Sequence, residues 1–309
     1  MRKNVFFLLV IGLITFINPV KGQSKVIIDA DTANEVDDIV AIARALMSDK
    51  LEILGITAAQ WNNEYTWMLN TVEESWQLNN QILNFKGRED IPSKVGSEKL
   101  VGARWVGNSI LELKMNPQPS DASNFIVKTA LSMPAGEKLT ILVLGAITNV
   151  ASAILQDPSI IEKISVRFIG TLFDFNKNVW NKNEFNTRND LNALDAVLNT
   201  PDLDLHILPA NLVDKLSFKN KSSMARFEGL DGIDALILER WKLKVPESND
   251  EWGWIMWDVG LIHTLINPGW FREMTVNTPP ENLQRQIKVY SWADIDKMKN
   301  DFWGHFGKK

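Results

Sequence analysis

The sequence predicts an α/β fold, in which a mostly parallel open sheet carries helices on both faces. Short apolar runs rich in β-formers alternate along the chain with segments of helical spacing. The run at residues 139–145 is almost wholly apolar, as expected of a strand buried on both faces. The chain has 309 residues and no internal repeat or long linker, so one domain is expected over residues 24–309.

Each predicted element follows from a local pattern. Strands are expected where β-rich apolar runs are short, and helices where apolar residues recur every three or four positions. The predicted strands are 25–30, 51–58, 139–145, 165–170 and 205–208, and the predicted helices are 36–47, 64–78, 147–155 and 191–198. The less regular segment 211–254 is expected to form a helical cap or lid. Sites in such sheets lie at the carboxyl ends of the strands.

The composition excludes several classes of function. The chain has no cysteine, which removes disulfides, thiolate nucleophiles and zinc–thiolate sites, and its three histidines make a multi-histidine metal site improbable. The net charge of −5 gives no basic field for nucleic acid, and glycine-rich phosphate loops are missing. Carboxylates, amides and the indoles of 12 tryptophans must therefore carry most of the chemistry.

The first residues have the layout of a secretory signal peptide. Arg2 and Lys3 precede an apolar run at 5–16, which is short for a membrane span, and small or modest residues lead to Gly22. We predict a signal peptide at residues 1–22 and a periplasmic or secreted mature protein with no stable membrane span. The alternative is an uncleaved N-terminal anchor. No cysteine follows the run, which excludes a lipoprotein anchor.

An acidic cluster follows the first predicted strand. Five carboxylates lie within residues 29–38 and would repel one another at a strand end. Asp37 and Asp38 could simply cap the next helix. That reading explains Asp29 and Asp31 poorly, whereas a bound cation offsets the repulsion. Oxygen ligands on an irregular loop favour Ca²⁺ over Mg²⁺.

Further motifs follow the acidic run along nearly the whole mature chain. In chain order, they are Gly55-Ile56-Thr57 followed by Asn62, the turn Leu144-Gly145-Ala146-Ile147-Thr148-Asn149, Glu184-Phe185-Asn186 with Asn178 upstream and Asp190 after it, and Trp257-Asp258. Together with the acidic run, which is similar to an Asp-x-Asp and Asp-Asp signature, these motifs resemble those of the inosine–uridine nucleoside hydrolases. Each match alone is weak, but together they occur in order at plausible spacing.

The resemblance implies a fold, a reaction and a set of roles. It implies a Rossmann-type sheet, hydrolysis of ribonucleosides to ribose and base, and a homodimer or homotetramer. Asp31 would be the general base. The implied Ca²⁺ ligands are Asp31, Asp38, Asp258 and the carbonyl of Leu144, and the implied ribose-binding residues are Asp37, Asn62, Asn178, Glu184 and Asn186. Carboxylates suit this reaction because positive charge builds on the sugar as the bond breaks.

Three departures from the family pattern bear on the chemistry. The acidic loop is two residues longer, with Asn34 and Glu35 in place of Pro-Gly, and either of them could help to bind the metal. Trp257 stands where many members have a histidine that protonates the leaving base. Residues 102–105 replace a histidine-containing segment, so base specificity is not transferred.

The later motifs also have plainer interpretations. The segment around Glu184 and Asn186 could be a solvated loop, and Thr148, Asn149 and Asp258 could be helix caps. The tryptophans could be core residues; otherwise they stack on a base or sugar, and the candidates are Trp254 and Trp257, with Trp252 and the more distant Trp241. His206 and His263 are expected to be packed or exposed and not catalytic.

Two other functions stay open beside a nucleoside hydrolase. One is a metal- and carbohydrate-binding protein on the same fold that lacks catalysis, which the missing histidine and the many tryptophans favour. The other is a hydrolase of a different glycoside. A nucleoside hydrolase is expected to need the ribose 2′- and 3′-hydroxyls of its substrate, whereas a hydrolase of a different glycoside is not.

Overall fold

A computed structural model describes residues 22–61, 70–105, 113–245 and 253–308. Its main sheet has eight strands in the order β13-β14-β10-β7-β6-β1-β2-β3. All neighbouring pairs in this sheet are parallel except β13 with β14. These strands are β1 (Ser24–Ala30), β2 (Leu51–Ala58), β3 (Ser93–Lys94), β6 (Leu139–Val143), β7 (Ile164–Ile169), β10 (Asp204–Leu208), β13 (Phe271–Asn277) and β14 (Gln286–Ala293). The predicted mostly parallel α/β sheet is confirmed.

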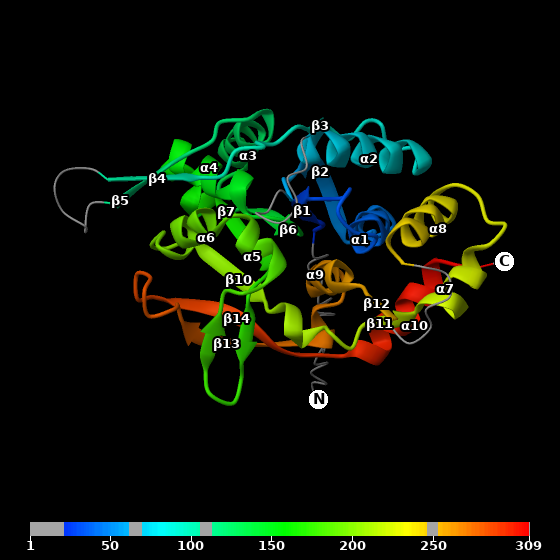
Figure 1. Ribbon diagram of the computed structural model, residues 1–309. Coiled ribbons are helices and arrows are strands. Elements are labelled where there is room, and N and C mark those ends of the chain that lie inside the picture. The colour runs from blue at the N-terminus through cyan, green and yellow to red at the C-terminus, as the bar shows by residue number, and fades with distance from the viewer. Residues whose placement is uncertain (1–21, 62–69, 106–112, 246–252, 309) are drawn as a thin grey trace, which may run out of the picture.

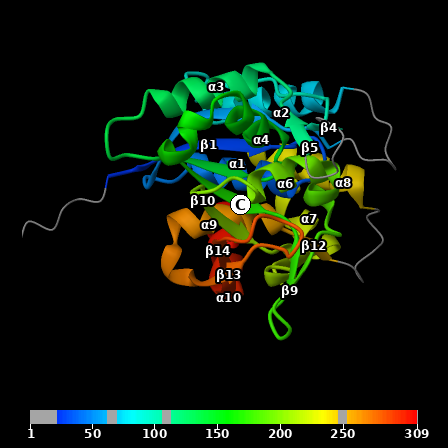
Figure 2. The ribbon, with the colours of Figure 1, turned by 90° about the vertical axis from the view of Figure 1, so that its left-hand side faces the viewer.

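Helices cover both faces of the sheet, because alternate residues of its buried strands point to opposite sides. Val26 and Ile28 belong to one hydrophobic cluster, whereas Ile27 belongs to the other. Helices α3 and α4 lie on one side of β1, and α9 and α10 lie on the other (Figures 1 and 2). The helices are α1 (Asp37–Leu46), α2 (Thr71–Phe85), α3 (Asp121–Leu131), α4 (Thr148–Gln156), α5 (Phe185–Asn189), α6 (Leu191–Leu198), α7 (Asn220–Phe227), α8 (Ile233–Lys244), α9 (Trp257–Ile266) and α10 (Ile295–His305).

Three parts of the fold differ from the sequence prediction or extend it. The helix expected at 64–78 is α2, which begins at Thr71 and continues to Phe85; residues 62–69 lie outside the description. The expected cap contains α7, α8 and the antiparallel pair of β11 (Ser217–Lys219) with β12 (Gly253–Ile255). The C-terminal β13, β14 and α10 were not predicted. Two further antiparallel pairs are β4 (Gly102–Trp105) with β5 (Leu113–Asn116) and β8 (Leu172–Asp174) with β9 (Val179–Asn181).

The predicted signal peptide lies almost wholly outside the described residues, which begin at Gly22. Within the described part of the chain, no helix is both long enough and apolar enough to cross a bilayer.

A nearly buried ion pair joins α1 to α10. Arg44 Nε and Nη2 donate to the two carboxylate oxygens of Asp301 at 2.6 and 3.0 Å, and His263 Nε2 lies 3.4 Å from Asp301 Oδ2. Burial alone would raise the pKa of Asp301, but hydrogen bonds from His263 and Arg44 hold it well below the usual range. This pair fixes the helix that begins at the acidic loop.

We expect Asp301→Asn to lower the free energy of unfolding by about 3 kcal/mol, because it leaves the Arg44 guanidinium buried without a counter-charge. Chemical denaturation of the purified protein measures the loss. The matched control is Asp296→Asn on the same helix, where the side chain is exposed and the change should stay within about 0.5 kcal/mol. Equal effects of the two substitutions would contradict a stabilising ion pair.

Candidate active site

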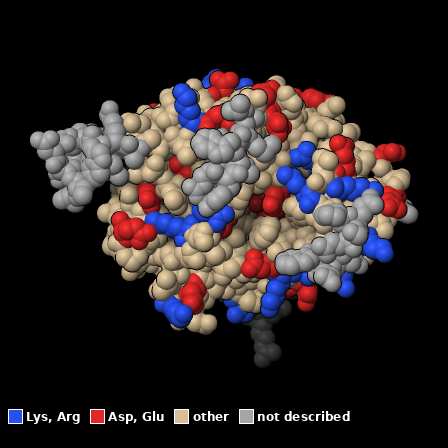
Figure 3. All heavy atoms as spheres, in the orientation of Figure 1, with Lys and Arg blue, Asp and Glu red and all other residues tan. Residues whose placement is uncertain are grey.

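A cavity of about 230 Å³ opens at the carboxyl ends of the central strands. Its lining comes from the segments after β1, β6, β7 and β10 and from the first turn of α9. Figure 3 shows Asp and Glu side chains in the central hollow of this face. The lining residues include seven carboxylates: Asp31, Glu35, Asp37, Asp38, Glu184, Asp214 and Asp258. The position agrees with the rule that parallel sheets place ligands beyond the carboxyl ends of their strands.

The acidic loop brings its side chains into this cavity directly. β1 ends at Ala30, the amide of Asn34 donates to the carbonyl of Asp31 at 2.7 Å, and α1 starts at Asp37. The N-cap of α1 is Val36, and no side chain caps this helix end. The plain interpretation of Asp37 and Asp38 as caps is therefore wrong. Both are almost fully buried and line the cavity.

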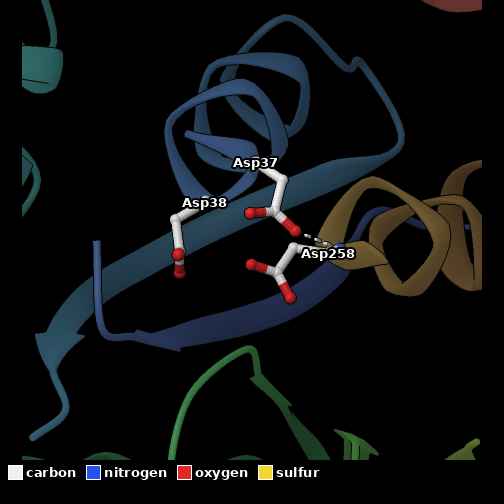
Figure 4. Close-up of side chains that lie close together, drawn as sticks. All are labelled: Asp37, Asp38 and Asp258. Atoms are coloured by element: carbon white, nitrogen blue, oxygen red, sulfur yellow. Dashed lines mark hydrogen bonds between the residues drawn. The ribbon is translucent and has the colours of Figure 1, made fainter. Parts of the chain in front are cut away.

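Three carboxylates from two helices converge at the floor of the cavity. Ligand atoms of Asp37, Asp38 and Asp258 all lie within 4.8 Å of one another (Figure 4). The amide of Asp258 donates to Asp37 Oδ2 at 3.2 Å, which joins the start of α9 to the start of α1. Asp258 does not cap α9 through its side chain. Asp31 adds a fourth buried carboxylate, since its charge acts on Asp38 and Asp258.

These carboxylates fit a divalent cation. Asp31, Asp37 and Asp38 each keep one buried oxygen that accepts no hydrogen bond from any described residue. Burial, followed by the charges of neighbouring carboxylates, raises the pKa of Asp31, Asp38 and Asp258 well above the usual range. Burial also raises the pKa of Asp37 to about 6, although backbone donors at Asp258 oppose the shift. An all-oxygen set with unsatisfied lone pairs suits Ca²⁺ or Mg²⁺.

Glu184 and Asn186 are held in place, which rules out the solvated-loop interpretation. Glu184 accepts hydrogen bonds from the amides of Thr171, Asn186 and Thr187 at 2.9–3.1 Å and caps α5. Burial raises its pKa against these donors. The side-chain amide of Asn186 donates to the carbonyls of Leu144 and Ile169, so its oxygen remains as an acceptor toward the cavity that it lines.

Thr148 and Asn149 support the site from behind and do not cap α4, whose N-cap Ile147 receives no side-chain bond. Thr148 Oγ1 donates to Asp190 at 2.8 Å. Asn149 Nδ2 donates to Asp29 Oδ1 at 2.8 Å, and Thr57 donates to the same oxygen at 2.6 Å. Asp29 therefore holds β1 against β2 and α4 through hydrogen bonds. Asp31 is the strand-end carboxylate that lines the cavity.

One predicted ribose-binding residue lies outside the lining of the cavity. Asn178 occupies the turn between β8 and β9 with φ +58°, and its amide donates to the carbonyl of Asp174. Because it sits at this hairpin turn, Asn178 is absent from the cavity lining. Asn62 lies outside the described residues. Leu144, by contrast, lines the cavity, and its role as a cation ligand stays a prediction.

The tryptophans divide into different environments. Trp257 lines the cavity, and its indole N–H donates to Asp214 Oδ1 at 3.1 Å. Trp254 packs partly buried against the core beside Asp37 and does not line the cavity. Trp241 is fully buried and donates to Asn220, so its proposed stacking role is wrong. Trp252 lies outside the described residues.

Asp214 was missed by the sequence reasoning. It follows β10 and the short turn at Ala210–Leu212, so its position after a predicted strand was the available signal. The histidines lie elsewhere: His206 bonds Asp204 and Glu273, and His263 is buried beside Trp270.

Gly145 allows Asp31 to approach the turn after β6. A Cβ at this position would lie 2.5 Å from Asp31 Oδ1 and 2.8 Å from its Cγ. We expect Gly145→Ala to displace the carboxylate and lower kcat/KM about 100-fold, the usual cost of misplacing a reacting group by about 1 Å. Steady-state kinetics measure the effect. The control is Gly304→Ala in α10, where a Cβ meets nothing within 4 Å; its activity should match the parent. Full activity of Gly145→Ala would show that this approach is unimportant.

Comparison with protein families gives one match over most of the chain. Residues 26–300 match the model described as inosine-uridine preferring nucleoside hydrolase. An uncharacterized protein of Schizosaccharomyces pombe is 28% identical over 293 residues, which cover 88% of this chain and 90% of that protein. A probable uridine nucleosidase 2 of Arabidopsis thaliana is 30% identical over 57% of this chain and 56% of its own length. The uridine nucleosidase matches thus span less than two thirds of those relatives.

Solved structures share the fold. A plant nucleoside hydrolase superposes with a TM-score of 0.66 at 18% identity, over 90% of this chain and 97% of that one. A purine-preferring ribonucleoside hydrolase from Gardnerella vaginalis gives the same TM-score and identity, over 90% and 96% of the two chains. At such low identity, these superpositions speak for the fold alone.

Proposed function

The chain belongs to the inosine–uridine preferring nucleoside hydrolase family and is a hydrolase of N-glycosyl compounds; we propose that it cleaves ribonucleosides to ribose and free base and depends on Ca²⁺. The observation that carries the proposal is the convergence of Asp37, Asp38 and Asp258 beside Asp31, with buried carboxylate oxygens left unsatisfied among the described residues. So many buried carboxylates repel one another unless a bound cation offsets their charge.

The proposed cation ligands are Asp31, Asp38, Asp258 and the carbonyl of Leu144. That carbonyl accepts one hydrogen bond from Asn186 and keeps a second lone pair. Asp37 belongs to the same trio of carboxylates and is proposed to bind a ribose hydroxyl. When bound, Ca²⁺ would supply orientation of the sugar diol and a lowered pKa for the attacking water.

The residues of the chain would perform the remaining steps. Asp31 would take the proton of the attacking water, since it is the carboxylate at the end of β1 and faces the cavity. Glu184 would accept from a ribose hydroxyl with its remaining lone pairs, and Asn186 would do so through its side-chain oxygen. The surrounding carboxylates would stabilise the positive charge that develops on the sugar ring.

We further propose that residues 1–22 are a signal peptide and that residues 24–309 act in the periplasm or outside the cell. The support is the basic start and short apolar run of the sequence. Expression of the full chain, followed by cell fractionation and N-terminal sequencing of the exported protein, tests both parts. An intact N-terminus in the membrane fraction would instead identify an anchor.

Ribose release tests the function. Protein lacking residues 1–22 is incubated with inosine, guanosine, adenosine, uridine and cytidine, with Ca²⁺ or with a chelator. Release of free sugar that stops with the chelator supports the proposal. The alternative is a carbohydrate-binding protein without catalysis, which Trp257 at the usual histidine position favours. Ca²⁺ binding without release of sugar from any nucleoside or other glycoside would support this alternative. Cleavage that does not need the 2′- and 3′-hydroxyls would favour another glycoside.

A further inference from the structure

The lining of the cavity pairs an aromatic side chain with a carboxylate. Trp257 is partly buried, lines the cavity and donates its indole N–H to Asp214 at 3.1 Å. Asp214 itself is exposed. An aromatic ring beside a carboxylate is an arrangement that binds organic cations, through the ring quadrupole and through opposite charge.

The charge of the lining agrees with this reading. The described lining residues include seven carboxylates and no lysine, arginine or histidine. A single divalent cation supplies two positive charges, so more than two ionised carboxylates in this lining leave a net negative charge. Two cations of α8 lie near the acidic loop, but Arg240 donates to the carbonyl of Ala33, Lys244 lies over the ring of Trp61, and neither lines the cavity.

The chemistry of the leaving base also favours a cationic substrate. A neutral nucleoside loses its base as an anion unless an acid protonates it, and an anion beside these carboxylates is electrostatically disfavoured. Trp257 cannot supply that proton, because its N–H is only a donor and does not ionise near neutral pH. A base that already carries a positive charge at the glycosidic nitrogen needs no acid.

We propose, on the basis of the proposed nucleoside hydrolase function, that the preferred substrates are ribosides of cationic nitrogen heterocycles, with Trp257 and Asp214 binding the charged ring. The C1′–N bond breaks and its electron pair returns to the ring nitrogen, which cancels the positive charge. The water oxygen forms the new bond to C1′, and the proton of the water passes to Asp31. The products are ribose, a neutral base and one released proton.

Turnover gives the first test. The pair of substrates is the N-ribosylnicotinamide cation and its neutral 1,4-dihydro form, with inosine and uridine as further neutral substrates. Rates are divided by the uncatalysed rate of each compound. We expect kcat/KM for the cation to exceed that for the neutral compounds at least about 100-fold, the lower end of what a general acid contributes.

Binding removes the intrinsic reactivity of the cation from the comparison. In the Asp31→Asn variant with Ca²⁺ present, calorimetry should give a Kd for the cation about tenfold below that for the dihydro form. Asp31→Asn/Asp214→Asn should lose this difference and keep its affinity for the dihydro form, whereas the control Asp31→Asn/Asp121→Asn, altered at an exposed residue, should keep it.

The outcomes separate the two proposals. Hydrolysis of neutral nucleosides as fast as the cation, or equal binding of both forms, overturns the substrate class and leaves the hydrolase function intact. No release from any riboside, by protein that melts cooperatively and binds Ca²⁺, overturns the nucleoside hydrolase function itself.

Discussion

Replacement of Asp31 by asparagine is expected to lower kcat by roughly 10³-fold or more, since a general base alone contributes about 10²–10⁴-fold. The substitution keeps the shape of the side chain and removes its ability to take a proton. It also weakens one proposed cation ligand. Asp31 is 2% exposed and lies against Gly145. A water molecule therefore has little room to enter beside the asparagine and take over the role of the lost carboxylate.

Two measurements separate lost chemistry from lost folding. Thermal melting should show that Asp31→Asn is folded, because removing one of several mutually repelling buried carboxylates relieves charge in the cation-free protein. The control is Glu162→Gln, an exposed carboxylate outside the cavity, which should leave kcat unchanged. A folded Asp31→Asn that turns over at the parent rate would exclude Asp31 as the base.

Ca²⁺ is expected to stabilise the protein more at pH 8 than at pH 5. Without a cation, burial and neighbouring charges raise the pKa of Asp31, Asp38 and Asp258, and that of Asp37 reaches about 6. The folded state then binds more protons than the unfolded state between the ordinary carboxyl pKa and these raised values. Its stability must therefore fall as the pH rises through this range.

A bound cation removes this loss, because it takes the place of the protons. At a Ca²⁺ concentration about 100 times its Kd at pH 8, the gain is about 2.7 kcal/mol, or roughly 4–5 °C in Tm for a chain of this size. Differential scanning calorimetry at both pH values, with and without Ca²⁺, measures the difference. The same shift at pH 5 and pH 8 would show that these carboxylates do not hold the ion, and NaCl at matched ionic strength controls for screening.

The central sheet could be predicted because its signal is local. The strand β2 lies at Leu51–Ala58, as predicted, since a run of β-branched and apolar residues has few other ways to be buried. The antiparallel strands β13 and β14 were missed because their exposed and buried residues alternate irregularly, so that pairing between distant segments decides their structure. The helix α2 begins at Thr71 and not at residue 64, where the prediction began it.

The same distinction explains the candidate site. Residues that directly follow a strand, such as Asp31 and Leu144, line the cavity because the end of a parallel strand fixes their position, and their proposed roles stay predictions. Asn178 was chosen by its spacing from Glu184, but it lies in the turn of the β8–β9 hairpin, and the spacing does not show where that turn points. Asp214 needed the path of the chain after β10, which is not a local property.

The hydrogen bond from the amide of Asp258 to Asp37 joins residues 221 positions apart. The trio of Asp37, Asp38 and Asp258, two of which are proposed cation ligands, therefore cannot form on the ribosome until about the first five sixths of the chain have emerged and α9 has docked on α1. An ion that binds only this completed arrangement has nothing to hold in an earlier folding intermediate. It consequently acts on the rate at which the finished protein opens and leaves the rate of initial chain collapse unchanged.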